Sequence, residues 1–160
     1  MSRRLVLAAL LALLAIAGSR SVTSAAGGPP KLKSVTLHIF NRVFTSFHDK
    51  VVAVPNREFR VGDTEFTARV IRFEPDFALD LKSHKVTSRS AEPRNPAFQI
   101  EVSRKGTPHD TCWAFFNMPP HYGVREELAF VATRIEFANR PPLESRDSIA
   151  VRIEGGGAAH

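Results

Sequence analysis

The sequence has little cysteine and no acceptor site for N-linked glycosylation. Cys112 is the only cysteine among 160 residues, so no disulfide can form within the chain, and the fold must rest on its apolar core. No Asn is followed two residues later by Ser or Thr, which excludes N-glycosylation. We expect Cys112 to be a small buried side chain beside Trp113; a reactive or metal-binding thiol is the alternative.

The chain also lacks a run of basic residues. Its formal charge of +6 comes from 22 Lys and Arg against 16 Asp and Glu. Three of the arginines lie in the first 26 residues, which contain no acid, so the remainder carries 19 cations and 16 acids, or +3. Those cations are isolated along candidate strands, as on a solvated surface, and nucleic-acid binding is not expected.

No catalytic constellation is recognisable. The chain has no Gly-x-Ser-x-Gly motif and no local signature of a Cys-His enzyme. Two acidic pairs, Asp76 with Asp80 and Glu126 with Glu127, could in principle supply a general acid and a general base. Asp76 and Asp80 have the parity of the solvent-facing side of a strand. We therefore expect that the protein is not an enzyme.

The N-terminus has the pattern of a secretory signal. A short cationic head precedes an unbroken apolar run from Leu5 to Ala17, and small residues follow as far as Ala26. The run of about 13 residues is shorter than the ~20 that span a bilayer as a helix, which favours cleavage over retention as an anchor. Residues 1–26 are therefore predicted to be a signal peptide for the periplasm or the exterior, by a Sec-type route; the paired arginines of the head also resemble a twin-arginine signal.

After a flexible leader (residues 27–34), the chain consists of short segments in which apolar and polar residues alternate, as they do in strands. A Gly62-Asp63 pair between two such segments predicts a two-residue hairpin. A change of phase near Val70 predicts a β-bulge that would let Ile71 and Phe73 face the core together with Phe66, Ala68 and Val70. The segments cover residues 35–40, 51–54, 58–61, 64–73, 77–81, 86–90, 98–103, 111–116, 126–137 and 149–153.

These segments predict an all-β domain over residues 35–154, an antiparallel β-sandwich or partly open barrel of seven to nine short strands, with a disordered tail at 155–160. Only the signal peptide is expected to be helical. Two segments are ambiguous: residues 41–50 could form a helical turn or an irregular strand, and residues 126–137 could be a helix, although their Phe, Val, Thr and Ile favour a strand.

Two proline-containing corners lie in the middle of this domain, where the chain is expected to turn. The structural corner residues are Pro75, Asp76, Phe77, Asn95, Pro96 and Trp113. The apolar residues predicted to form the core beside them are Phe98, Ile100, Val102, Trp113 and Phe115. Arginines flank the corners at Arg89, Arg94 and Arg125; they could bind a carboxylate or propionate, but solvated or structural ion pairs are the simpler interpretation.

One cluster of residues has the chemistry of a metal site. His109, Cys112, Met118 and His121 lie within thirteen residues, and thiolate, thioether and imidazole suit copper. In a blue-copper loop the order is Cys, His, Met, whereas here Met118 precedes His121. Haem is a related alternative with His121 or Met118 as an axial ligand, although no Cys-x-x-Cys-His attachment site exists. The simpler interpretation needs no cofactor: His109 is a turn residue, Met118 fills the core, and His121 caps the Pro-Pro corner.

A longer pattern resembles a known family. Phe73-Glu74-Pro75-Asp76-Phe77 is followed by Ser88-Arg89-Ser90, by Glu92-Pro93-Arg94-Asn95-Pro96-Ala97, by a Gly106 turn and by Trp113-Ala114-Phe115. Over about residues 58–120 this order resembles the extracytoplasmic β-domain of ResB-type cytochrome c biogenesis proteins. The resemblance implies a β-rich periplasmic domain that acts in haem delivery and cytochrome c assembly with a membrane protein partner. Members of that family span the membrane several times, and their membrane-embedded histidines have no counterpart here.

The sequence therefore predicts a non-catalytic exported β-domain, a protein-interaction or accessory module, with a membrane or periplasmic protein as partner and peripheral membrane association as a further option. Cytochrome c maturation enters through the resemblance alone. A small periplasmic haem- or copper-binding carrier is the alternative function.

Overall fold

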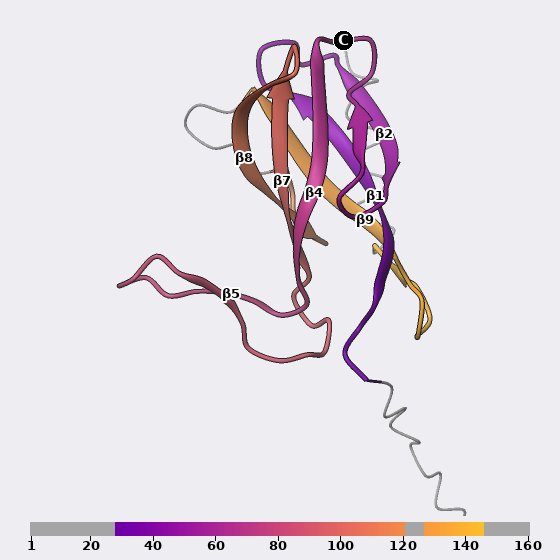
Figure 1. Cartoon of the computed structure of the whole chain (residues 1–160), viewed down its shortest axis with the longest axis vertical. Coiled ribbons are helices and arrows are strands. Elements are labelled where there is room, and N and C mark those ends of the chain that lie inside the picture. Colours follow the sequence, from indigo (N-terminus) through magenta and orange to yellow (C-terminus); the bar gives the residue numbers. More distant parts are fainter. Residues whose placement is uncertain (1–27, 121–126, 146–160) are drawn as a thin grey trace, which may run out of the picture.

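The structure, a computed structural model, describes residues 28–120 and 127–145, and in these ranges it is all-β (Figure 1). Its strands are β1 (Leu32–Asn41), β2 (His48–Ala53), β3 (Glu58–Arg60), β4 (Phe66–Glu74), β5 (Phe77–Leu79), β6 (Val86–Ser88), β7 (Ala97–Arg104), β8 (Thr107–Phe116), β9 (Leu128–Phe137) and β10 (Leu143–Glu144). Seven of them, without β5, β6 and β10, form a nearly closed barrel, which confirms the predicted all-β class.

The barrel strands follow one another around the ring in chain order. The sheet runs β2-β1-β9-β8-β7-β4-β3, and β2 and β3 lie side by side where the ring closes. All the ladders are antiparallel except β8 with β9, which pair in parallel at Phe115 with Val131 and Phe116 with Ala132. The expectation of a purely antiparallel sheet is wrong at this place. Seven strands cannot alternate in direction all round a ring, so one boundary has to be parallel.

Side chains close the seam between β2 and β3, which share no ladder. The amide of Gly62 donates a hydrogen bond to Oδ2 of Asp49 at 2.6 Å. Gly62 has a φ of 51°, and a Cβ added to it would lie 3.1 Å from Cε2 of Phe47. Glycine is therefore needed here for its positive φ and for the close approach of the ring.

The predicted hairpin at Gly62-Asp63 is confirmed, since β3 and β4 pair antiparallel. Its loop is longer than the two residues expected. The amide of Val61 donates to the carbonyl of Phe66 at 3.1 Å, so four residues, Gly62 to Glu65, form the connection.

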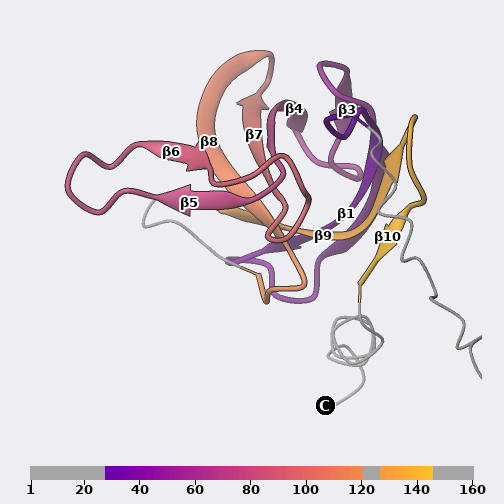
Figure 2. The same ribbon diagram turned by 90° about the horizontal axis from the view of Figure 1, so that it is seen from below.

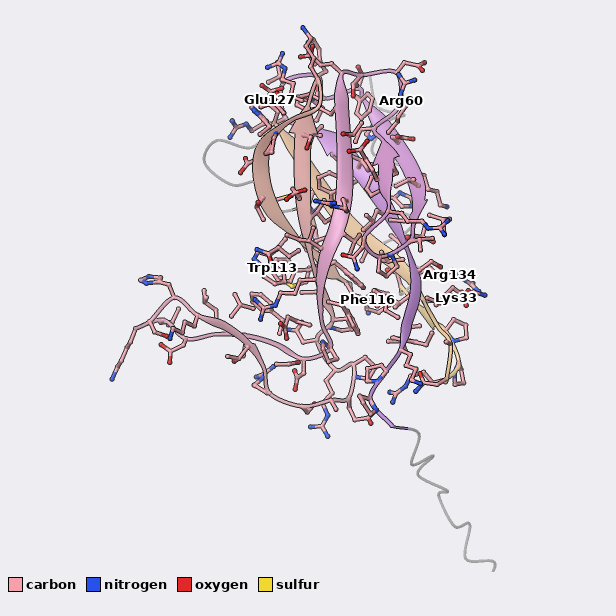
Figure 3. All side chains as sticks on the ribbon, in the orientation of Figure 1. Lys33, Arg60, Trp113, Phe116, Glu127 and Arg134 are labelled. Atoms are coloured by element: carbon pink, nitrogen blue, oxygen red, sulfur yellow. The ribbon has the colours of Figure 1, made fainter. Side chains whose placement is uncertain are left out.

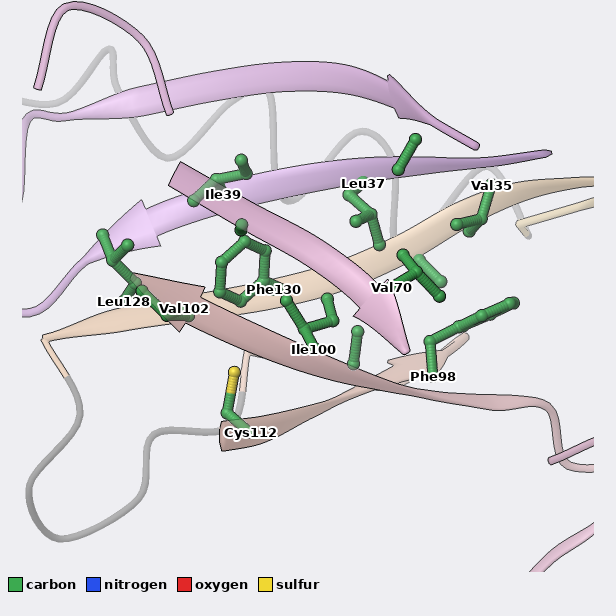
Figure 4. Close-up of a cluster of buried hydrophobic side chains, with 14 of the residues drawn as sticks. Val35, Leu37, Ile39, Val70, Phe98, Ile100, Val102, Cys112, Leu128 and Phe130 are labelled. Atoms are coloured by element: carbon green, nitrogen blue, oxygen red, sulfur yellow. The ribbon is translucent and has the colours of Figure 1, made fainter. Parts of the chain in front are cut away.

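The core fills the inside of the barrel (Figure 4). The predicted core residues Phe98, Ile100 and Val102 of β7 are buried there. The side chains that are most completely buried are Phe98, Phe130, Leu37, Ile39, Ile100, Ile135, Val35, Val61, Val70 and Val131.

Two residues predicted to belong to this core do not. Trp113 and Phe115 are only partly buried and lie on the outer side of β8, because Cys112, Ala114 and Phe116 of that strand take the inward parity. Both faces of β8 are apolar, so alternation alone could not tell which set points inward.

The predicted change of phase in β4 is confirmed as a bulge, since the register with β7 shifts between Val70 and Arg72. The bulged residue, Ile71, is 37% exposed, so the expectation that it faces the core is wrong. Phe73 beyond it stacks on Phe98 with ring centroids 5.1 Å apart. A second shift, in the pairing of β1 with β9, accounts for the phase change in Leu128–Phe137, which is a strand and not a helix.

Residues 41–50 contain the end of β1, a loop over residues 42–47 and the start of β2, so only residues 48–50 are the strand that was left open as an alternative. The leader predicted over residues 27–34 is too long, because β1 already begins at Leu32. Several sequence predictions lie outside the described residues: the signal peptide, residue 27 of the leader, the strand at 149–153, the tail, and His121, Arg125 and Glu126.

The strands β5 and β6 form a separate two-stranded sheet. Figures 1 and 2 show that this hairpin projects sideways from one end of the barrel. Residues 75–96, which include it, connect the neighbouring strands β4 and β7.

Candidate functional site

The predicted corner residues meet at the base of the β5–β6 hairpin. The amide of Phe77 donates to the carbonyl of Asn95 at 3.0 Å, and the amide of Asn95 donates to the carbonyl of Pro75 at 3.3 Å. The side-chain amide of Asn95 donates to the carbonyl of Phe77 at 3.1 Å. These bonds pin the outgoing and returning chains together. Beyond them, the carbonyl of Pro96 accepts a bond from the amide of Phe116.

Asp76 is the polar centre of this base. Its Oδ1 pairs with Nη2 of Arg89 at 3.0 Å, and its Oδ2 accepts a hydrogen bond from the hydroxyl of Ser90 at 3.1 Å. Its amide donates to Oγ of Ser88 at 2.8 Å. With 4% of its surface exposed, Asp76 is buried, so the expectation that it faces solvent is wrong. The partners that bury it lie 12 to 14 residues further along the chain.

This geometry gives Asp76 and Asp80 different surroundings. Asp80 is exposed at the tip of the hairpin, beyond the other end of β5. The pKa of Asp80 is held below its ordinary value because its carboxylate accepts hydrogen bonds from Ser83 and then from Lys82. Each carboxylate therefore accepts hydrogen bonds within the hairpin, Asp76 at its base and Asp80 at its tip.

An aromatic contact attaches the hairpin to the outside of the barrel. The ring of Phe77 makes edge contacts with Trp113 and with Phe115, each with centroids 5.0 Å apart. The guanidinium of Arg72 lies 6.0 Å from the Trp113 ring and also donates to the carbonyl of Val86 at 3.1 Å. Figure 3 shows Trp113 near the end of the barrel from which the hairpin projects. We call Arg72, Asp76, Phe77, Arg89, Asn95 and Trp113 the hairpin anchor.

Of the residues proposed as metal ligands, the structure describes His109, Cys112 and Met118, and it does not bring these three together. His109 is exposed near the start of β8, with its ring 5.8 Å from that of Phe66, whereas Cys112 is buried inside the barrel. Met118 is 43% exposed, so the expectation that it fills the core is wrong. Within the part of the chain that the structure describes, no three His, Cys, Asp or Glu side chains are grouped so that they could hold a metal ion.

His109 and Cys112 do line one small cavity at an end of the barrel. Its volume is about 10 Å³, which is room for about one water molecule. The other residues around it are Phe66, Val102, Asp110, Glu127 and Leu128. A haem does not fit in this space.

Ion pairs cover much of the outer barrel surface. Glu65 contacts Lys105 and Arg104, and these cations, Lys105 first, hold the pKa of Glu65 below its ordinary value. Arg134 pairs with Glu136 and Glu144, which raise the pKa of its guanidinium. Solvent screens such exposed pairs, so they contribute little to stability.

A different surface is apolar and exposed. It comprises two pairs of residues, Val43 and Phe44 in the loop before β2 and Val52 and Val54 on and just after β2, which are 63%, 67%, 64% and 39% exposed. The exposed His48 and Lys50 lie between the two pairs. We call the four apolar residues the β2 apolar surface. Sequence analysis did not identify it, because apolar residues in a short strand look the same whether they face a core or solvent.

Sequence analysis also missed Arg72 as a hairpin contact. The sequence does contain a sign of its position, since Arg72 and Glu74 alternate with apolar residues at the end of β4; the two side chains form an ion pair at 2.5 Å.

No protein-family model, curated protein or solved structure matches this chain. Residues 28–120 and 127–145 contain no helix with the length and apolarity needed to cross a membrane.

Proposed function

We propose that this chain is a non-catalytic, exported β-barrel domain that acts by contacting a partner protein, as an accessory module. The observation that carries the proposal is the β2 apolar surface. Exposed apolar patches of this kind on soluble proteins commonly mark sites of protein–protein contact.

The loop that presents part of this surface is ordered. Oδ1 of the buried Asn41 accepts hydrogen bonds from the amides of Val43 and Phe44, both at 2.8 Å. The amide of Phe47 donates to the carbonyl of Phe44 at 2.9 Å. Val43 and Phe44 are thus held outward in a fixed loop, which lowers the entropy that a partner would have to overcome on binding.

The β2 apolar surface continues along the strand. Val52 pairs with Thr36 of β1 and lies two positions from Lys50, which pairs with His38. Side chains two apart in a strand share a face, so Val52, Lys50 and His48 form an outward row beside the loop. Aromatic and aliphatic anchors with a polar rim are typical of protein interfaces.

The interior of the barrel supports the same proposal. Buried side chains occupy it, and the cavity beside Cys112 holds about one water. The partner that we propose is a membrane or periplasmic protein of cytochrome c maturation. This assignment rests on the likeness of residues 58–120 to ResB-type domains, and it implies that haem is handled by the partner.

Site-specific photocrosslinking tests the proposal. A benzoylphenylalanine placed at Phe44 or at Val52 is expected to crosslink one envelope protein in cells of the source organism, and Phe44→Asp is expected to abolish capture from position 52. The matched control is the same probe at Arg60, an exposed residue of β3. Equal capture from all three positions, or none from Phe44 and Val52, contradicts the proposal.

A further inference from the structure

We propose that the tip of the β5–β6 hairpin docks on an anionic phospholipid bilayer, with Leu79 and Leu81 entering the interface and Lys82 and Lys85 facing the lipid phosphates. This inference concerns a surface separate from the β2 apolar surface and does not depend on a protein partner.

The first observation is the exposure of the two leucines. Leu81 is 80% exposed, more than any other large apolar side chain in the described residues, and Leu79 is 45% exposed. Leu79 lies two positions from Phe77 in β5 and pairs with Val86 of β6. One face of the hairpin therefore contacts the barrel through Phe77 and carries the more exposed Leu79 beyond this contact. Figure 2 shows the hairpin extending away from the barrel in this direction.

The second observation is that the tip holds these side chains in place. Oδ1 of Asp80 accepts hydrogen bonds from the amides of Lys82 and Ser83, both at 2.8 Å. The amide of His84 donates to the carbonyl of Asp80 at 2.8 Å, and the amide of Asp80 donates to the carbonyl of Lys85 at 3.0 Å. The tip is a closed turn, so Leu81 is presented by the fold and not by a loose loop.

Charge favours an anionic surface as the occupant. Lys82, His84 and Lys85 are exposed around Leu81, and the one carboxylate of the tip, Asp80, is engaged by two backbone amides. Cations beside exposed apolar side chains are typical of segments that bind anionic lipid interfaces.

Size favours a bilayer over a protein. A stable protein interface needs about 800 Å² from each partner, and two leucines on a projecting tip cannot supply that area. A bilayer can take up single side chains, and each inserted side chain raises the partition coefficient in proportion to the apolar area that it buries.

The position of the hairpin agrees with this orientation. Arg140 contacts Glu92, just after β6, at 2.9 Å and the carbonyl of Gly28 at 3.3 Å. The base of the hairpin and the start of the described chain therefore lie at the same end of the barrel (Figure 1). If the predicted signal peptide binds a membrane before its cleavage, this end of the barrel is the one next to the bilayer at that stage.

Vesicle binding tests the proposal. All the described strands follow residue 31, so the chain beginning at residue 27 retains the whole barrel and can be used without the apolar run. We expect it to sediment with vesicles of phosphatidylcholine and phosphatidylglycerol, less at high salt, and less with phosphatidylcholine alone. Leu79→Ser combined with Leu81→Ser is expected to lower the partition coefficient at least about tenfold. Lys82→Glu combined with Lys85→Glu should remove the preference for anionic lipid, and Leu81→Phe should retain binding.

Arg57→Glu combined with Arg60→Glu, on and beside β3, is the charge-matched control and should leave binding near that of the unaltered protein. In a Cys112→Ser background, an environment-sensitive dye at Leu81→Cys should shift to the blue on vesicles, whereas the same dye at Arg57→Cys should not. Binding that is absent, or that the hairpin variants do not change, overturns the proposal. The proposal is also overturned if the variant with Leu79→Ser and Leu81→Ser still binds vesicles but no longer gives the crosslink from position 44. The tip would then contact the protein partner.

Discussion

Replacing Asp76 by alanine tests whether the hairpin anchor depends on this buried carboxylate. The change removes the acceptor for the Ser90 hydroxyl and for the Arg89 guanidinium. A hydrogen bond to a charged group contributes about 1.5–3 kcal/mol, which applies to Ser90 because Asp76 is only 4% exposed. The side chain of Arg89 is 64% exposed, so its pairing is worth only the ~0–1 kcal/mol of a surface ion pair.

The two contributions amount to about 1.5–4 kcal/mol, lost from the docking of the hairpin. Because the core lies inside the barrel and the anchor outside it, we expect this loss to appear mainly as local opening. Native-state hydrogen exchange measures it. The amide of Phe77 donates to the carbonyl of Asn95 and that of Arg89 to the carbonyl of Asp76, and both amides should exchange about 10 to 1,000 times faster in the variant.

Single variants of the partners separate the two contributions. Ser90→Ala should accelerate exchange at Phe77 more than Arg89→Ala does, since the arginine is mostly exposed. Asp63→Ala, at an exposed carboxylate in the β3–β4 loop, is the control. If Asp76→Ala left both amides within about threefold of the original rate, a change below ~1 kcal/mol, the assignment of Asp76 as the centre of the anchor would be refuted.

Three further predictions follow from the same geometry. Phe77→Ala should expose Trp113, the single tryptophan of the chain, and shift its emission to the red while the far-ultraviolet circular dichroism stays unchanged; an unshifted spectrum would argue against docking through these rings. The lowered pKa of Asp80 means that its charged carboxylate stabilises the folded tip. This stabilisation is complete above the ordinary aspartate pKa of about 4 and is lost as pH falls through the lowered pKa. The amide resonances of Lys82 and Ser83 should therefore keep their positions to below pH 4, and Asp80→Asn should abolish the transition. Titration with haem or Cu(I) should leave the absorbance spectrum unchanged, because His109 and Met118 face solvent while Cys112 lies inside the barrel; a stoichiometric band would support the carrier function instead.

The alternation of apolar and polar residues predicted strands well where one face of the strand is exposed to solvent. In β7, Phe98, Ile100 and Val102 point inward, with Gln99 and Glu101 between them only partly buried, and the sequence shows this pattern directly. In β8 the outward residues Trp113 and Phe115 are also apolar, because Phe77 covers them from a segment that lies about 36 residues earlier. The local sequence pattern of β8 cannot show that a residue so far away in the chain will pack on its outer face.

The same limit explains the errors at Asp76 and at β9. The parity of β5 assigns Asp76 to solvent, but Ser88, Arg89 and Ser90 return from β6 to enclose it. The parallel pairing of β8 with β9 follows from the odd number of strands in the barrel and from the direction in which the chain returns after Phe116. The sequence of a single strand gives neither of these. The corner prolines were informative because Pro75 directly follows β4 and Pro96 directly precedes β7, whereas Pro108 lies within β8.

The connection between β4 and β7 shows where this fold departs from the minimum that a barrel needs. These two strands are antiparallel neighbours, and such a pair can be joined by a turn of two residues. Here residues 75–96 intervene, and they carry their own two-stranded sheet together with a buried carboxylate, an aromatic contact and crossed backbone bonds at its base. Burying a charge is unfavourable unless it is fully paired, and the barrel core lies elsewhere, so the anchor contributes chiefly to the direction in which the hairpin points. The proposed membrane contact depends on the exposed leucines at the end of this anchored hairpin, whereas the proposed protein contact uses the separate apolar side chains on and beside β2.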